Sequence, residues 1–223
     1  MTLAWTLVVP VKPASVGKSR LRVPGVDRAS LARAIARDTV VAARRSALVA
    51  RVLVVTGEPL GVEDVETVDD AGARGLDAAI ARGMAHAGDV PRAALLGDLP
   101  ALRPEDLDAA LLLAADADRA VVADAEGTGS TLVTAGPGIP WASAFGDGSF
   151  ARHVGLGCAA LPVAAASTLR RDVDTAAQLA AAASLGVGPH TTALLVAPDA
   201  AVETMAGRRR VSAATAGTPR PRP

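Results

Sequence analysis

The sequence predicts a single α/β domain built on a parallel, Rossmann-like sheet. In the first half, short apolar runs alternate with segments of helical spacing, which is the pattern of such a sheet. The length of 223 residues suits one domain of ordinary size. The apolar run 93–96 ends abruptly in Gly97-Asp98-Leu99-Pro100, as a buried central strand does at the carboxyl edge of a sheet. With only two Trp and two Phe, the core must be built from Ala, Val and Leu.

The expected elements follow the chain in order. Strands are expected at 5–11, 51–56, 65–68, 93–96 and 119–123, with a further β-prone run at 131–134. Helices are expected at 31–45 with Ser30 as its cap, at 75–86, at 104–115 with Pro104 in its first turn, and at 176–184. Residues 1–198 are expected to form the domain. The stretch 199–223, rich in Ala, Gly, Arg and Pro, is expected to be a disordered tail.

Composition excludes several functional classes. The 23 basic and 23 acidic residues balance, so neither a nucleic-acid nor a membrane partner is expected. The single cysteine excludes a disulfide framework and a Cys-based zinc site, and the three His lack metal-ligand spacing. No apolar run approaches the roughly 20 residues of a membrane span. The amino-terminal run has no basic region before it, so we expect no signal peptide and a cytoplasmic protein.

Asp98 is the first candidate functional residue. It follows the central strand at the edge where open α/β sheets bind ligands, and a carboxylate there suits a divalent metal on a phosphate-bearing substrate. The alternative is a carboxylate that merely caps the next turn.

The loop after the first strand carries three cations, Lys12, Lys18 and Arg20. It matches neither Gly-x-Gly-x-x-Gly nor a P-loop. Because a triphosphate needs several donors and positive charges, this loop is a candidate triphosphate site. The alternative is a solvated basic loop.

Further candidates lie later in the chain. Asp77 begins a helix whose amino end could face a nucleotide base or ribose, or could be an ordinary helix start. Gly148-Ser149 precedes a short helix and suits an anion, although Ser149 could simply be a cap. Asp172 and Asp174 alternate with Val173, so in an extended strand their carboxylates share one side, roughly 6–7 Å apart. Asp174 or Thr175 could also cap the helix at 176–184.

Five segments in order carry a family resemblance over residues 5–190. They are Val9-Pro10-Val11-Lys12 with Lys18-Ser19-Arg20-Leu21, Gly97-Asp98-Leu99-Pro100-Ala101-Leu102, Gly127-Thr128-Gly129-Ser130-Thr131, Phe145-Gly146 with Ser149-Phe150-Ala151-Arg152-His153, and Arg171-Asp172-Val173-Asp174-Thr175. The chain thereby resembles the phosphoenolpyruvate or 2-phospho-L-lactate guanylyltransferases of coenzyme F420 biosynthesis. The resemblance implies a nucleotidyltransferase fold of the glycosyltransferase-A type, with a mixed, mostly parallel sheet between helices.

The resemblance also implies roles for particular residues. The acid site falls on Thr131, Gly146 and Ser149, and the Mg²⁺ ligands on Asp98, Asp172 and Asp174. GTP falls on Lys12, Lys18, Arg20 and Asp77, with Asp98, Lys12 and Lys18 as the catalytic groups. Two positions depart from the family. Asp77 stands where family members more often have Asn, and Gly148 stands where they have a polar residue. The Ala- and Arg-rich composition suggests a high-GC bacterial source, which favours phosphoenolpyruvate over 2-phospho-L-lactate.

The implied reaction is an in-line attack by the acid's phosphate on the α-phosphorus of GTP, with pyrophosphate leaving. The family further implies that the product is handed to the next enzyme of the pathway. The oligomeric state stays open, with a homodimer as one arrangement. Two alternatives also stay open: a sister nucleotidyltransferase that uses a sugar phosphate or an alcohol, and a degenerate nucleotide-binding module without activity.

Overall fold

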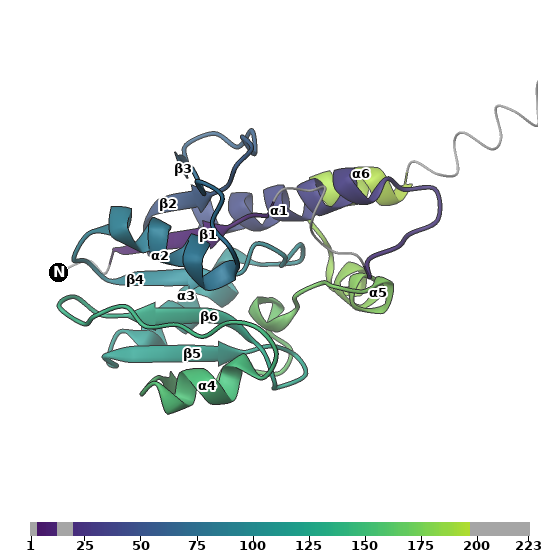
Figure 1. Cartoon of the computed structure of the whole chain (residues 1–223). Helices are drawn as coiled ribbons and strands as arrows, with labels where there is room; N and C mark the ends of the chain where they lie inside the picture. The colour runs from purple at the N-terminus through teal and green to yellow at the C-terminus, as the bar shows by residue number, and fades with distance from the viewer. Residues whose placement is uncertain (1–3, 13–19, 197–223) are drawn as a thin grey trace, which may run out of the picture.

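A computed structural model describes residues 4–12 and 20–196. Within them, one seven-stranded sheet has the order β3-β2-β1-β4-β6-β5-β7 (Figure 1). Its strands are β1 (Trp5–Pro10), β2 (Val49–Val55), β3 (Glu66–Val68), β4 (Arg92–Leu95), β5 (Arg119–Ala123), β6 (Ser130–Ala135) and β7 (Ala159–Ala160). In the described sheet only β6 runs antiparallel to its neighbours, β4 and β5. The expectation of a mixed, mostly parallel sheet is confirmed.

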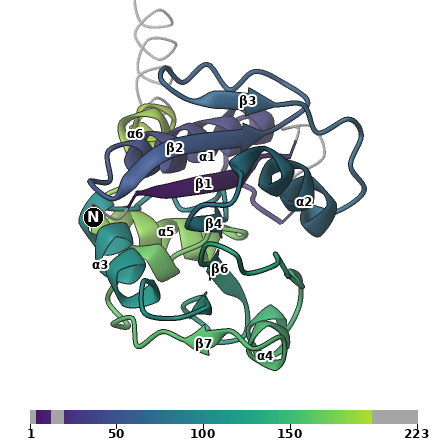
Figure 2. The same ribbon diagram turned by 90° about the vertical axis from the view of Figure 1, so that its left-hand side faces the viewer.

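Helices cover both faces of the sheet (Figure 2). Helices α1 (Arg28–Arg44) and α3 (Pro104–Ala114) pack on one face, and α2 (Leu76–Ala87) and α4 (Ser149–Gly155) on the other. Beyond the carboxyl edge lie a 3₁₀ turn (Thr168–Arg170) and α5 (Ala176–Leu185), while α6 (Pro189–Val196) lies beside α1. In the described part, no single helix has the length and apolarity to cross a membrane; only α5 and α6 together do, and they are bent by 116°.

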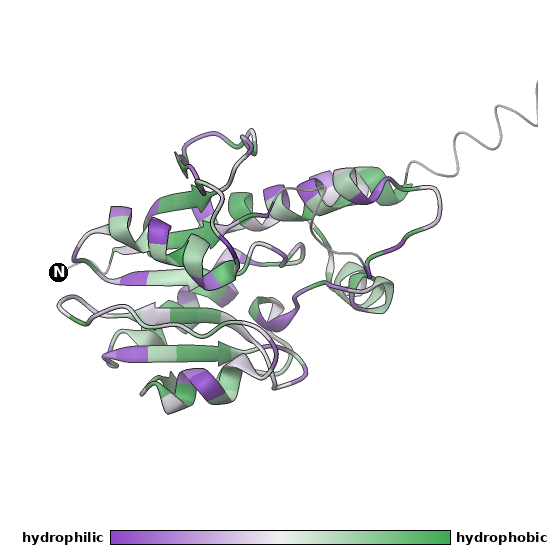
Figure 3. Cartoon of the chain, in the orientation of Figure 1, coloured by the Kyte–Doolittle hydropathy of each residue, from purple (hydrophilic) through white to green (hydrophobic). Residues whose placement is uncertain are grey.

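The central strands are apolar on both faces, which is why they form the middle of the sheet. Every residue of β1 and of β4 is buried. Figure 3 shows β5 hydrophilic at its start and hydrophobic along most of its length. The main core cluster consists almost entirely of Ala, Val and Leu, as expected from the small number of aromatic residues.

Helix caps agree with the sequence in part. Pro104 opens α3, as expected. Thr175, one of the two candidates, caps α5 through a capping box with Gln178. The cap of α1 was expected at Ser30 but is Asp27, whose carboxylate accepts the Ser30 N–H at 2.8 Å. That hydrogen bond lowers the pKa of Asp27. Ser30 was a wrong choice because either residue type caps well, and the helix begins one turn earlier.

Two segments beyond the sheet differ from expectation. No strand forms at 171–174; the segment is irregular chain that follows the 3₁₀ turn. Helix α6 was not expected. It is held by the buried Asp38 of α1, whose carboxylate accepts the N–H groups of His190 and Thr191 at its first turn. The expected tail from residue 199 lies outside the described residues.

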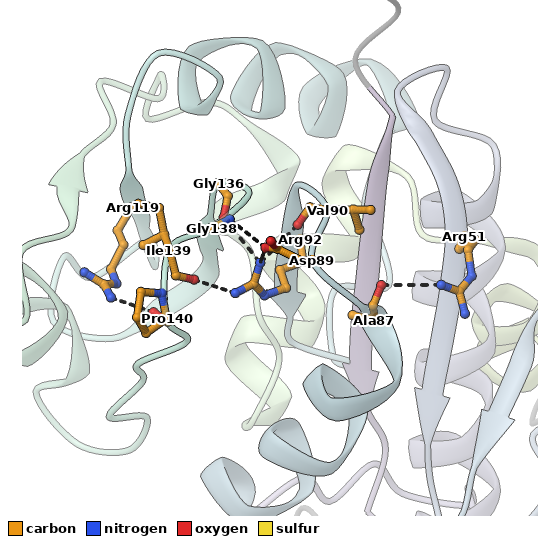
Figure 4. Close-up of polar contacts among 10 residues, drawn as sticks. All are labelled: Arg51, Ala87, Asp89, Val90, Arg92, Arg119, Gly136, Gly138, Ile139 and Pro140. Carbon is orange, nitrogen blue, oxygen red and sulfur yellow. Dashed lines mark hydrogen bonds and ion pairs between the residues drawn. The ribbon is translucent and has the colours of Figure 1, made fainter.

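Two arginines form hydrogen bonds with loops at the end of the sheet opposite the carboxyl ends of the parallel strands (Figure 4). Arg92, at the start of β4, is buried and donates to the carbonyls of Val90, Gly136 and Ile139. Arg119, at the start of β5, donates to the carbonyl of Pro140. These bonds satisfy loop carbonyls and fix the turn after β6, from which the chain continues to the site described below.

Gly83 allows α2 to lie close to the sheet. A Cβ at this position would come within 2.3 Å of Val8 Cγ1 and 2.8 Å of Val55 Cγ2, both in buried side chains. We expect Gly83→Ala to lower the free energy of unfolding by about 1–2 kcal/mol, because overpacking outweighs the gain in helix propensity. Urea unfolding measures this change. Gly155→Ala is the matched control, since nothing lies within 4 Å of its added Cβ. Equal stability of both variants would contradict the packing argument.

Candidate active site

A cavity of about 530 Å³ opens at the carboxyl edge of the parallel strands. Its walls come from the ends of β1, β4 and β5, the start of β6, the 145–149 loop and the 172–174 segment. Six residues expected to be functional line it: Lys12, Asp98, Gly146, Ser149, Asp172 and Asp174. Segments distant in sequence therefore meet at one place.

The residues on either side of Asp98 fix its backbone at the carboxyl ends of the parallel strands. A Cβ on Gly97 would lie 3.0 Å from the Pro10 carbonyl oxygen, so a glycine allows the two strand ends to stay close. On the other side, Leu99 is fully buried and its N–H donates to Thr39 Oγ1 at 2.9 Å. Both contacts limit the freedom of the backbone that carries the Asp98 carboxylate.

The 172–174 segment is fastened directly to Asp98. The Val173 N–H donates to the Asp98 carbonyl at 3.0 Å, and the Val173 side chain is fully buried in the cluster formed with α1 and α5. The carboxylates on either side of Val173 both line the cavity. Both residues therefore line one cavity, although a buried valine and one backbone hydrogen bond hold the segment there rather than a strand.

A fourth carboxylate, Asp124, was missed as a site residue. It follows β5 directly, whereas Asp98 lies three residues after β4, and it is buried. Its oxygens accept the N–H groups of Thr128 and Gly129 at 2.9 and 2.7 Å, which closes the 124–129 loop. Gly129 is needed here, because its Cβ would lie 2.3 Å from Asp124 Oδ2. The signal was available: an aspartate directly after a second buried, parallel strand.

The clustered carboxylates repel one another. Burial raises the pKa of Asp172 to about 7, with further contributions from Asp98, Asp124 and Asp174. Asp172 Oδ1 is buried and accepts no hydrogen bond from the described residues. Asp124, Glu126 and Asp172 can each offer an oxygen within 4.8 Å of the others. An acidic cluster of this kind fits a divalent cation, which would offset the repulsion and use the oxygen that lacks a partner.

The wall continues from the 124–129 loop to the 143–149 loop and the start of α4. Gly146 and Gly148 have φ of +111° and +67°, in the region that glycine adopts readily. The Ser149 N–H donates to the Gly146 carbonyl, and the Phe150 N–H to the Thr128 carbonyl. These two N–H groups are thus committed within the protein, and Ser149 offers its hydroxyl to the cavity.

The remaining candidate residues lie elsewhere. Asp77 accepts the Ser143 hydroxyl at 2.7 Å and the Phe145 N–H at 3.1 and 3.2 Å, so its carboxylate holds the 143–145 loop. Thr131 is buried next to the cavity-lining Ser130, and its Oγ1 has no hydrogen-bond partner among the described residues. Arg20 is exposed and is absent from the cavity wall, whereas Lys18 lies outside the described residues.

Solved structures establish the class of fold. A nucleotidyl transferase from Methanothermobacter matches with a TM-score of 0.58 at 19% identity, covering 83% of this chain and 98% of that one. A Mycobacterium tuberculosis protein solved in complex with manganese matches with a TM-score of 0.53 at 17% identity, covering 80% and 96% of the two chains. The fold is that of a nucleotidyl transferase.

Sequence comparison then defines the family. Residues 5–195 match the family model described as "Guanylyl transferase CofC like". The phosphoenolpyruvate guanylyltransferase of Thermomonospora curvata is 46% identical over 202 residues, covering 86% of this chain and 89% of that protein. The enzyme of the same name from Geodermatophilus obscurus is 47% identical over 204 residues, covering 86% and 94%. The chain belongs to the CofC-like guanylyl transferase family.

Proposed function

We propose that this protein joins GMP from GTP to the phosphate of phosphoenolpyruvate and releases pyrophosphate. A phosphate oxygen of the acid attacks the α-phosphorus of GTP, the bond from that phosphorus to the bridging oxygen breaks, and pyrophosphate leaves with the electron pair. The observation that carries the proposal is the convergence of Asp98, Asp172 and Asp174 on one cavity in a chain of this family. The product belongs to coenzyme F420 biosynthesis and passes to the next enzyme of that pathway.

The protein's own contribution is alignment and control of charge. The attacking phosphate is already ionised at neutral pH, so no strong general base is needed. Asp98, Asp172 and Asp174 are proposed to hold Mg²⁺, which when bound offsets the negative charge of both phosphates. Lys12, after β1, faces the leaving pyrophosphate, with Lys18 and Arg20 from the same loop as the further cations.

The acid is proposed to bind at the part of the wall formed by the 143–149 loop and the start of α4. Gly146 and Ser149 line it, and Thr131 follows Ser130 in β6. Asp77 was assigned to the nucleotide. Its carboxylate holds the loop that ends at Gly146, so we propose that it acts on the acid side by fixing that loop.

A pyrophosphate-release assay tests the function. Purified protein with Mg²⁺ is given each nucleoside triphosphate in combination with phosphoenolpyruvate or 2-phospho-L-lactate. We expect release with GTP and phosphoenolpyruvate, and much less with the other pairs. Preference for 2-phospho-L-lactate would reassign the acid. Release only with a sugar phosphate or an alcohol would indicate a sister transferase, and no release with any pair would favour a binding module.

A further inference from the structure

A buried histidine, His153, lies next to Ser130 and Ser149, two serines of the wall at which the acid is proposed to bind. His153 of α4 is fully buried, with Nδ1 2.9 Å from Ser130 Oγ. Its Nε2 accepts the backbone N–H of Ala144 at 2.9 Å. The hydroxyl oxygens of Ser130 and Ser149 are 3.3 Å apart, and both serines line the cavity. An unbroken row of polar atoms therefore runs from the Ala144 backbone to the cavity.

The first bond of the row fixes the tautomer of the ring. A backbone N–H can only donate, so Nε2 must carry the lone pair that accepts from Ala144. Burial lowers the pKa of His153, which favours the neutral ring, although the nearby Asp77 acts in the opposite direction. In a neutral ring whose Nε2 is an acceptor, the proton sits on Nδ1. His153 therefore donates to Ser130 Oγ.

That donation gives the rest of the row its direction. In the structure, Ser149 Oγ is placed as the donor to Ser130 Oγ. A hydroxyl can rotate and can accept and donate at once, so when an anion enters the cavity Ser130, which accepts from His153, can donate to Ser149 instead. Ser149 is then able to turn its own hydroxyl proton toward the cavity. Its backbone N–H is already committed to the Gly146 carbonyl, which leaves the hydroxyl as the donor that this residue offers.

We propose that His153 is a positioning residue which, through Ser130, sets the Ser149 hydroxyl as a hydrogen-bond donor to the carboxylate of the three-carbon acid. The inference rests on the proposed function. In the proposed function the acid's phosphate is engaged at the acidic cluster, so its carboxylate is the anionic group left for Ser149. Hydrogen bonds in such a row polarise one another, which strengthens the last donor toward an anion. Arg152 supports the wall by donating to the carbonyls of Ala144 and Phe145.

Packing is the competing explanation for any effect of His153. The ring meets Phe145 edge-on, with centroids 4.8 Å apart and planes at 69°. Loss of the ring could therefore disturb the loop without any role for the hydrogen-bonded row. The experiments must separate orientation of Ser149 from simple support of the loop.

The first experiment observes the ring directly. In ¹⁵N-labelled protein, long-range ¹H–¹⁵N spectra distinguish the two neutral tautomers and the imidazolium form, and loss of the signal in His153→Gln assigns it. We expect a neutral ring with the proton on Nδ1. A proton on Nε2, or an imidazolium at neutral pH, would overturn the proposal. This readout needs no turnover, so it stands even if the assay finds no guanylyl transfer.

The second experiment is a double-mutant cycle on the row. Ser130→Ala is expected to raise the KM for phosphoenolpyruvate roughly tenfold, with little change in the KM for GTP or in kcat. In the Ser149→Ala background the same change is expected to add less than about twofold, because Ser130 acts through Ser149. Equal effects in both backgrounds would refute the relay. His153→Gln, which can still accept from Ala144, is expected to follow Ser130→Ala, whereas the exposed His86→Gln of α2 should match the wild type.

Discussion

Asp98→Asn is expected to lower kcat for guanylyl transfer by at least about 100-fold while the protein stays folded. The amide has nearly the volume of the carboxylate, and the backbone contacts of Gly97 and Leu99 do not depend on the charge. What is lost is one negative charge at the wall that is proposed to hold Mg²⁺. Asp174→Asn is expected to behave alike, with less effect on stability because Asp174 is exposed.

Pyrophosphate release at saturating GTP and phosphoenolpyruvate, titrated with Mg²⁺, measures the effect. The control is Asp116→Asn, an exposed aspartate in the loop between α3 and β5, outside the cavity wall. It should leave turnover unchanged. If Asp98→Asn or Asp174→Asn turns over nearly normally at saturating Mg²⁺, the metal assignment is wrong.

Local patterns predicted six of the seven described strands, but they missed β7, and a mixed sheet was expected only from the family resemblance. Runs such as 93–96 are apolar on both faces, and burial on both faces is what a central parallel strand requires. The same logic predicted Asp98 at the carboxyl edge of the sheet, and the structure has it in the cavity wall, three residues after the end of β4. It applies equally to Asp124 after β5, where the hydrogen bonds to Thr128 and Gly129 give the side chain a structural role as well.

Long-range contacts account for the remaining differences. Nothing near position 173 indicates that its N–H will bond to the Asp98 carbonyl, 75 residues earlier in the chain. Asp77 presents the same difficulty, since its partners Ser143 and Phe145 are contributed by a distant loop. Helix α6 depends on Asp38, a buried carboxylate in the middle of α1. Each of these features is decided by tertiary hydrogen bonds, which local propensity does not encode.

The acidic cluster is a place where function and stability oppose each other. A metal site needs several oxygens close together before the ion arrives, and their mutual repulsion destabilises the fold. The raised pKa of Asp172 reports the cost of burying this carboxylate and, after that, of crowding it with the others, because its proton is retained to about pH 7 rather than lost near 3.8. Removing the charge of Asp172 should therefore stabilise the folded protein while it slows guanylyl transfer.

Asp172→Asn is accordingly expected to stabilise the metal-free protein at about pH 8 by roughly 1–2 kcal/mol, allowing for solvent screening at this partly exposed site. The folded pKa lies above the unfolded one, so between about pH 4 and 7 the folded state holds more protons. The wild type thus loses stability as pH rises through this window, and the penalty is complete above it. The variant lacks this slope, so the two proteins converge near pH 4.

Urea unfolding in a chelator at about pH 5 and about pH 8 measures the slope, and repetition with excess Mg²⁺ measures the response to the ion. Binding to the folded state alone should raise the stability of the wild type at about pH 8 more than that of Asp172→Asn. The rate of guanylyl transfer by the variant should also fall at least about 100-fold, because higher stability does not replace the lost metal ligand. Asp116→Asn should shift neither property. A variant less stable than the wild type at high pH without metal would mean that Asp172 is paired within the fold rather than crowded by its neighbours.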